Sequence, residues 1–188
     1  VSYTIRTSET FKLSFGVKGS ANLFTLDTDK LNPADPGDDY LQPVDNEFTP
    51  NVGAGLYFHS DKLYLGLSVP NILKEKVYSD NDYATYEQRM NYYFIAGYVF
   101  DISPTLKFKP AFLAKAVQGA PLQMDGSANF LLFDKLMLGA AYRSSGTVSA
   151  LAGFQITDGL FVGYAYDSET TKLENYNSGS HEIFLRFE

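Results

Sequence analysis

The chain has 188 residues, of which 45% are hydrophobic and 15% aromatic, and its formal net charge is -7. This apolar content is sufficient for a folded domain, and the negative charge argues against nucleic-acid binding, which needs a basic surface. The absence of cysteine excludes disulfides, thiolate metal ligands and a cysteine nucleophile, and no apolar run is long enough for a transmembrane helix.

Alternation of apolar and polar residues begins at the start of the chain. A first strand is expected near residues 2–7, and the next segment carries apolar residues at every second position from Phe11 to Leu23. After a polar stretch at 27–48, the alternation returns at 52–58 and 63–69. Successive side chains of a strand point to opposite faces, so each segment has one apolar and one polar face.

The same pattern continues to the end of the chain. It is clearest at 106–116, where Leu106 and Phe108 alternate with Lys107 and Lys109. Further alternating segments cover 92–100, 122–132, 136–142, 148–156, 160–166 and 181–187. We count about eleven strands of roughly 8 to 15 residues, which suits membrane barrels better than globular sheets. The predicted fold class is all-β, an antiparallel up-and-down transmembrane β-barrel that is part of a larger barrel.

Short and long connections are expected to alternate. Tight turns are predicted at Asp61-Lys62, Ser103-Pro104-Thr105, Asp134-Lys135 and Asp158-Gly159. Long polar connections are predicted at 27–48, 74–90 and 168–179, with shorter ones at 116–122 and 143–147. Short periplasmic turns and long extracellular loops are typical of outer-membrane barrels, whose apolar face meets lipid. Alternation alone also fits a soluble lipocalin-like binder with inverted faces.

The direction of the strands bears on domain organisation. If the tight turns are periplasmic, the last strand ends at Phe187 and Glu188 in the periplasm and the first strand begins at the outer surface. A closed barrel has no unpaired strand edges in lipid. We therefore expect residues 1–188 to be a single outer-membrane β-barrel domain whose N-terminal strands lie upstream.

The sequence offers little material for catalysis or metal binding. Its two histidines are His59 and His181, and the run Ser180-His181-Glu182 cannot form a triad because adjacent strand residues point apart. The acidic loop from Asp27 to Asp39 lacks EF-hand spacing, so a solvated loop is favoured over a calcium site. No catalytic residue, metal site or cofactor is predicted.

Two groups of residues are candidates for contact with a partner. The predicted lumen face carries charges that either bind a cargo segment or, the favoured interpretation, pair with one another; these are Lys107, Lys109, Lys115, Asp125 and Arg143, with Lys12 and Lys18. A possible partner-contact loop at 74–90 carries Tyr78, Tyr83 and Tyr86, because exposed aromatic residues offer large contact area. Lipid-facing girdles are expected from Tyr92, Tyr98, Tyr142, Tyr164 and Tyr166.

Five segments, in order, resemble the PorP/SprF family of the type IX secretion system of Bacteroidota. They read PNVGAGLYF (50–58), LGLSVPN (65–71), FKPAFLAKAVQGAP (108–121), LAGFQI (151–156) and NYNSGSHEI (175–183).

This resemblance implies an outer-membrane component involved in export or surface attachment of cargo such as gliding adhesins, and not an enzyme. The implied partners are a periplasmic ring lipoprotein, secreted adhesin domains and the lipid bilayer. The same barrel also fits an outer-membrane channel or hydrophobic-solute transporter, since a fold does not dictate function.

Overall fold

The computed structural model describes residues 1–26, 44–73, 76–78, 84–87, 89–171 and 179–187. Their strands are β1 (Ser2–Arg6), β2 (Lys12–Leu26), β3 (Val44–His59), β4 (Leu63–Val69), β5 (Lys76–Tyr78), β6 (Ala84–Glu87), β7 (Asn91–Tyr98), β8 (Phe100–Ser103), β9 (Leu106–Val117), β10 (Gln123–Leu132), β11 (Leu136–Arg143), β12 (Thr147–Thr157), β13 (Leu160–Glu169) and β14 (Ser180–Phe187). Within these residues, no helix is long and apolar enough to cross a membrane.

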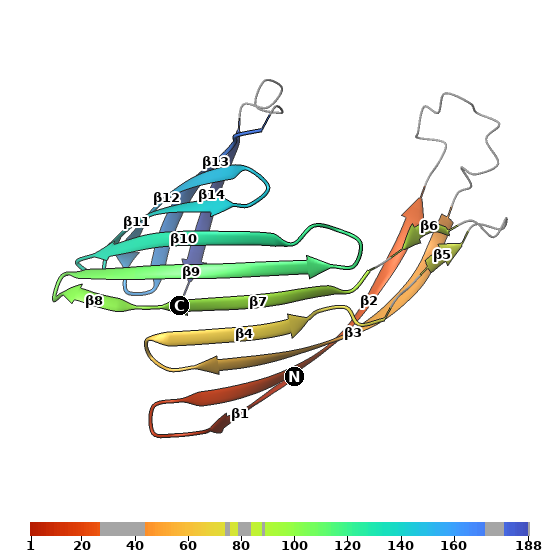
Figure 1. Ribbon diagram of the computed structural model, residues 1–188, viewed down its shortest axis with the longest axis horizontal. Helices are drawn as coiled ribbons and strands as arrows, with labels where there is room; N and C mark the ends of the chain where they lie inside the picture. Colours follow the sequence, from red (N-terminus) through yellow and green to blue (C-terminus); the bar gives the residue numbers. More distant parts are fainter. Residues whose placement is uncertain (27–43, 74–75, 79–83, 88, 172–178, 188) are drawn as a thin grey trace.

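One large antiparallel sheet contains nearly all of the strands. Its order is β1-β2-β3-β4-β7-β9-β10-β11-β12-β13-β14, with β8 also paired to β9, while β5 and β6 form a separate two-stranded sheet (Figure 1). β8 continues β7, because β9 pairs first with β7 up to Gly97 and then with β8 from Phe100. Pro110 of β9 lies beside this interruption, and proline cannot donate a hydrogen bond to a neighbouring strand. The predicted up-and-down sheet of about eleven long strands is confirmed.

Tight turns and longer connections alternate along this sheet. The tight turns occupy 7–11, 60–62, 104–105, 133–135 and 158–159, and the opposite end has the connections 27–43, 70–90, 118–122, 144–146 and 170–179. In Figure 1 the turns after β1, β3, β8 and β10 lie at the left, away from the long connections at the right and top. The turn after β10 places Phe133 and Asp134 at φ 54° and 55°, which is the two-residue conformation that matches strand twist.

Two features of the long-connection end differ from the predicted strands. β3 begins at Val44, inside the stretch expected to be a loop, and the hairpin β5–β6 was not predicted. The pairing of β3 with β4 stops at Ala54 and Val69, so the earlier part of β3 pairs only with β2 and projects as a two-stranded arm (Figure 1). The start of this β3 segment reads Asp45-Asn46-Glu47, three successive polar residues, so no apolar alternation marks it.

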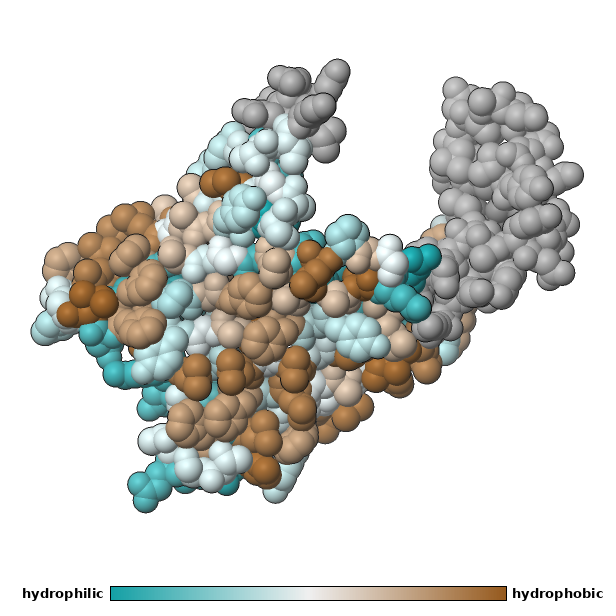
Figure 2. All heavy atoms as spheres, in the orientation of Figure 1, coloured by the Kyte–Doolittle hydropathy of each residue, from teal (hydrophilic) through white to brown (hydrophobic). Residues whose placement is uncertain are grey.

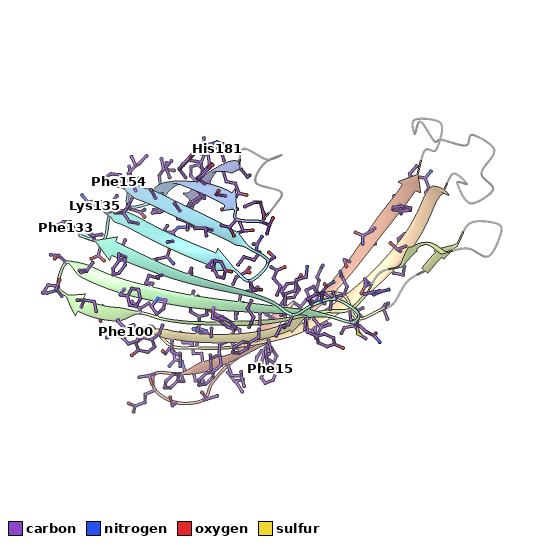
Figure 3. All side chains as sticks on the ribbon, turned by 45° about the horizontal axis from the view of Figure 1, so that its top comes forward. Phe15, Phe100, Phe133, Lys135, Phe154 and His181 are labelled. Carbon is purple, nitrogen blue, oxygen red and sulfur yellow. The ribbon has the colours of Figure 1, made fainter. Side chains whose placement is uncertain are left out.

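The register places the apolar residues on one face of the sheet. Phe15 of β2 pairs with Leu56, Leu56 with Leu67, and Leu67 with Phe94. Figure 3 shows the sheet curved into a trough, with Phe15 on its outer, convex side. The exposed fractions on this face are high, 44% for Phe15 and 55% for Leu67, and Figure 2 shows apolar side chains spread over the middle of the visible surface.

The least exposed residues lie on the concave face instead. Asn51, Thr49, Thr147, Phe161 and Ala165 are each less than 9% exposed and occupy the strand positions that alternate with the apolar set. A soluble lipocalin-like binder would place its apolar faces inside, so the structure shows the opposite arrangement. A convex apolar surface of this extent requires a covering apolar medium.

Aromatic residues gather near the tight turns on the convex face. Phe11 stacks on Phe58 with ring centroids 5.0 Å apart. A second series joins β7, β8, β9 and β10, with centroid distances of 4.5 Å from Tyr98 to Phe100, 6.1 Å from Phe100 to Phe108 and 4.9 Å from Phe108 to Phe130. Tyr92, Tyr142 and Tyr164 are also exposed on this face, at 49%, 56% and 43%. These positions fit the interfacial aromatic girdles of membrane barrels.

The two edges of the large sheet run in the same direction. β1 leads into the tight turn at 7–11, and the end of β14 pairs with Leu160, which follows the tight turn at 158–159. Direct pairing of β1 with β14 would therefore be parallel, whereas every observed pair is antiparallel. The described strands form an open trough rather than a closed barrel.

Candidate functional site

The concave face is the candidate functional surface, because it is polar and is shaped by small residues. Several large side chains on this face lie over the glycine of a neighbouring strand. Tyr64 covers Gly97, its register partner, and Phe184 covers Gly163 in the same way. A Cβ atom at either glycine would overlap the covering ring. The glycines thus leave space for these large rings to lie flat against the concave face of the sheet instead of projecting into the trough.

The predicted lumen charges all fall on the concave-face register. Arg143 Nε lies 3.2 Å from Asp125 Oδ1, and Gln123 donates to the same carboxylate at 3.3 Å. Lys115 Nζ lies 5.9 Å from the centroid of the Tyr93 ring. The backbone oxygen of Lys109 accepts a bond from Asn129, 3.4 Å away. Asp125 and Arg143 form one pair, and cargo binding by these residues stays a prediction.

Ion pairs also connect strands at the tight-turn rim. Lys62 lies 2.6 Å from Asp101, and Lys107 lies 2.5 Å from Asp134. Because Asp101 and Lys107 are register partners, the four residues form an alternating series of charges along the rim. The hydrogen bond to Asp101 raises the pKa of the Lys62 ammonium above its usual value. These pairs are solvent-exposed, so their main consequence is a defined charge pattern rather than stability.

Asn51 fixes the root of the long connection after β4. It is 2% exposed, and its side chain donates to the Leu73 carbonyl at 3.0 Å and accepts from Leu73 N at 3.2 Å and from Val52 N at 2.9 Å. Pro70 lies against Gly53, where a Cβ would come 2.9 Å from Pro70 Cα. Asn51 and Gly53 together hold residues 70–73 over the concave face of β3.

The possible partner-contact loop begins at this root. Tyr78 is the last residue of β5 and Tyr86 lies in β6, where it pairs with Val77, while Tyr83 lies outside the described residues. The acidic loop from Asp27 to Asp39 also lies outside them. In the part of the chain that is described, no group of His, Cys, Asp or Glu could hold a metal ion.

His181 contacts two tyrosine side chains of β13. His181 lies on the convex-face register, and its Nδ1 is 2.6 Å from the Tyr164 hydroxyl. Its ring centroid lies 4.9 Å from that of Tyr166. Ser180 and Glu182 alternate with His181 along β14, so they belong to the opposite face.

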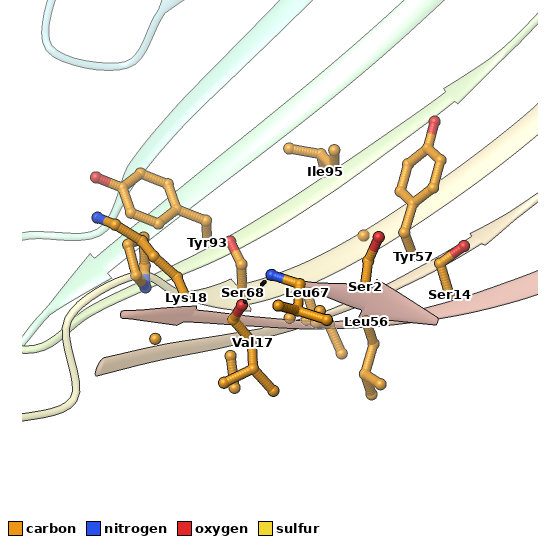
Figure 4. A pocket seen from close by; sticks show the side chains of 17 residues that line it. Ser2, Ser14, Val17, Lys18, Leu56, Tyr57, Leu67, Ser68, Tyr93 and Ile95 are labelled. Atoms are coloured by element: carbon orange, nitrogen blue, oxygen red, sulfur yellow. Dashed lines mark hydrogen bonds between the residues drawn. The ribbon is translucent and has the colours of Figure 1, made fainter. Parts of the chain in front are cut away.

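Sequence reasoning did not identify a hollow in the concave face near β1. Its volume is about 550 Å³, and its floor includes Gly16, Gly53, Gly55 and Gly66. Figure 4 shows Tyr57, Tyr93, Ile95 and Lys18 on the concave side of these strands, while Val17 and Leu56 point the other way. The recurring glycines on the polar face of 16–66 were the available signal, since strand glycines often mark close approach of a ligand.

Comparison with known proteins identifies one family. The family model described as type IX secretion system membrane protein PorP/SprF matches residues 1–187. A search of curated proteins returned no match.

Proposed function

The chain belongs to the PorP/SprF family of type IX secretion system membrane proteins, and on that premise we propose that it is an outer-membrane component supporting export or surface attachment of cargo such as gliding adhesins. The family match over 1–187 is the observation that carries this proposal. The exposed apolar convex face and its aromatic bands support residence in a bilayer. The short turns at one end support an orientation in which that end faces the periplasm.

A complete barrel would contain more strands than the trough has. Because β1 and β14 run in the same direction, antiparallel closure needs an odd number of further strands between them. A second copy of the chain in the same membrane orientation cannot close the barrel, because its β1 would run parallel to β14 of the first copy. In this proposal, strands of the same polypeptide preceding residue 1 complete the barrel, because unpaired backbone groups are not tolerated in lipid.

Barrel completion can be tested by hydrogen exchange on the full-length protein in lipid nanodiscs. If further strands cover β14, the amides of 180–187 that point away from β13 are protected as strongly as those of β13. Fast exchange of every second amide in this segment would contradict closure of the barrel.

The two ends of the barrel have different proposed partners. The tight-turn rim, with its alternating Lys62, Asp101, Lys107 and Asp134, is proposed to face the periplasmic ring lipoprotein. The loop at 74–90, anchored by Asn51, is proposed to contact secreted adhesin domains. Affinity purification of the detergent-solubilised full-length protein, followed by mass spectrometry, tests both: other secretion components are expected, and their absence contradicts the proposal.

The function itself is tested by genetic complementation. Deletion of the gene is expected to leave cargo inside the cell, and the unaltered gene restores cargo at the surface. Tyr78→Ala, Tyr83→Ala and Tyr86→Ala combined are expected to reduce restoration, whereas Phe at the same three positions retains it, because contact area is kept. Normal cargo export in the deletion strain would contradict the secretion role. Full restoration by the triple alanine variant would contradict only the role of the loop.

A further inference from the structure

The hollow over the four glycines has one charged end and one aromatic end. Along β2 and β3, the pair Lys18 and Gly53 lies nearest the long connections, and the pair Ser14 and Tyr57 lies nearest the tight turns. Gly16 and Gly55 pair between them and form the middle of the floor. The volume of about 550 Å³ is in the range of small-molecule sites. The hollow is therefore an elongated cavity with a distinct polar end.

The floor of the hollow offers almost no hydrogen bonding. At Gly16, Gly55 and Gly66 the strands β2, β3 and β4 pair on both sides, so the backbone N–H and C=O groups in the middle of the floor are used within the sheet, while β1 at the rim of the hollow pairs only with β2. The Ser14 hydroxyl is 2.8 Å from that of Thr4, and the Val1 nitrogen donates to the Val17 carbonyl at 2.9 Å (Figure 4). An extended peptide laid here would leave its own backbone unsatisfied. An apolar chain has no such requirement.

The charge around the hollow has a single sign. Among the described residues that line it, Lys18 has the charged side chain and none has a carboxylate side chain. Among the described residues, Lys18 forms no ion pair, whereas Arg143 and Lys107 on the same face each have a carboxylate partner. In a chain of net charge -7, an unneutralised cation beside an apolar cavity favours an anionic ligand.

We propose that this hollow binds a free long-chain carboxylate, with its alkyl chain over Gly16 and Gly55 and its carboxylate at Lys18. The Tyr57 and Ile95 side chains flank the chain, and Tyr93 lies beside the charged end. This ligand site is independent of the secretion role and adds a binding activity on the concave face.

The glycines of β2 provide a matched pair of variants to test the site. A Cβ at Gly16 would meet only the Gly55 oxygen, 3.9 Å away, so Gly16→Leu fits the strand while its side chain fills the hollow. Gly19 lies on the convex face of the same strand, and a Cβ there meets nothing within 4 Å. Gly19→Leu is therefore the same change outside the hollow. Both variants are first checked for the heat-modifiable migration of a folded barrel.

The measurement is titration of the full-length protein in phosphatidylcholine nanodiscs with 11-(dansylamino)undecanoic acid, with empty nanodiscs as the blank. We expect saturable fluorescence with the unaltered protein. Gly16→Leu is expected to weaken the affinity for the probe at least about ten-fold, which corresponds to two methylene groups of the probe losing their contact with the hollow. Gly19→Leu retains the affinity of the unaltered protein. Lys18→Gln weakens binding of this carboxylate about two- to five-fold but leaves its methyl ester unaffected.

Three outcomes would overturn the proposal. The first is a signal no larger than that of empty nanodiscs, and the second is equal affinity for the Gly16→Leu and Gly19→Leu variants. The third is photolabelling by a diazirine fatty acid that falls only on convex-face residues outside the hollow, such as Phe15 and Val52.

Discussion

At the scale of residues, the concave wall depends on complementary sizes across adjacent strands. Tyr64 lies over Gly97, Phe184 over Gly163, and Ile95 against Gly66, where a Cβ would come 2.7 Å from Ile95 Cγ1. The sequence predicts which face each of these residues occupies, because the period of a strand is two. It does not predict which glycine lies under which large side chain. That depends on the register between neighbouring strands, and some neighbours in the sheet, such as β4 and β7, are not consecutive in the chain.

The contact between Tyr64 and Gly97 gives the first prediction. Gly97→Val places a branched side chain in the volume of the Tyr64 ring and is expected to cost about 1–3 kcal/mol of unfolding free energy, the usual cost of overpacking. Tyr64→Ser in the same protein should recover most of this loss. The measurement is the urea midpoint of folding into lipid vesicles. Equal midpoints for Gly97→Val with and without Tyr64→Ser would contradict the proposed contact.

Asn51 gives the second prediction, on the root of the loop. Asn51→Ala leaves the backbone groups of Leu73 without their side-chain partner, at a cost of about 1–3 kcal/mol. Trypsin is expected to cleave after Lys74 and Lys76 faster in this variant while the barrel remains folded. Ser20→Ala is the control, since Ser20 is opposite Asn51 and its buried hydroxyl has no partner among the described residues. Unchanged cleavage in Asn51→Ala would exclude the anchoring role.

At the scale of elements, alternation predicted ten of the strands closely because each has one apolar face on the convex side of the sheet. Tight turns were predicted where Pro, Gly or Asp-Lys interrupt the pattern, and these lie at one end of the trough. The arm formed by the start of β3 and the hairpin β5–β6 was missed for a physical reason. Asp45, Asn46 and Glu47 are polar at three successive positions, so the start of β3 carries no period-two signal.

Two adjacent alanines of β11 test the assignment of its faces. Ala140 pairs with Ala128 and Ala150 on the convex face, whereas Ala141 pairs with Ser127 and Ser149 on the concave face. Ala140→Arg should destabilise the protein by about 2–4 kcal/mol, because it places a charge against lipid. Ala141→Arg should reduce stability by less, because Ala141 borders a second hollow of about 380 Å³ that can accommodate the longer side chain. Folding into vesicles measures both, and a larger loss for Ala141→Arg would reverse the assigned faces.

At the scale of the whole molecule, the trough separates an apolar exterior from a polar interior. The convex face is exposed and apolar, the concave face holds the buried residues, and both sheet edges run toward the tight turns. The sequence predicted the faces and the alternating connections, and its resemblance to PorP/SprF is confirmed by the match over 1–187. The shape of the interior could not be predicted, because the glycine-floored hollow arises from five strands brought together by register.

The most direct test of this account is a cysteine scan of β11 in the full-length protein, using a chain that has no native cysteine in its 188 residues. Single cysteines are placed at Leu138 and Ala140 on the convex face and at Met137, Ala141 and Arg143 on the concave face. The protein is reconstituted in lipid vesicles and treated with a water-soluble maleimide. Modification at 137, 141 and 143 with protection at 138 and 140 is the predicted result. Modification of the convex-face positions with protection of the concave-face ones would contradict the account.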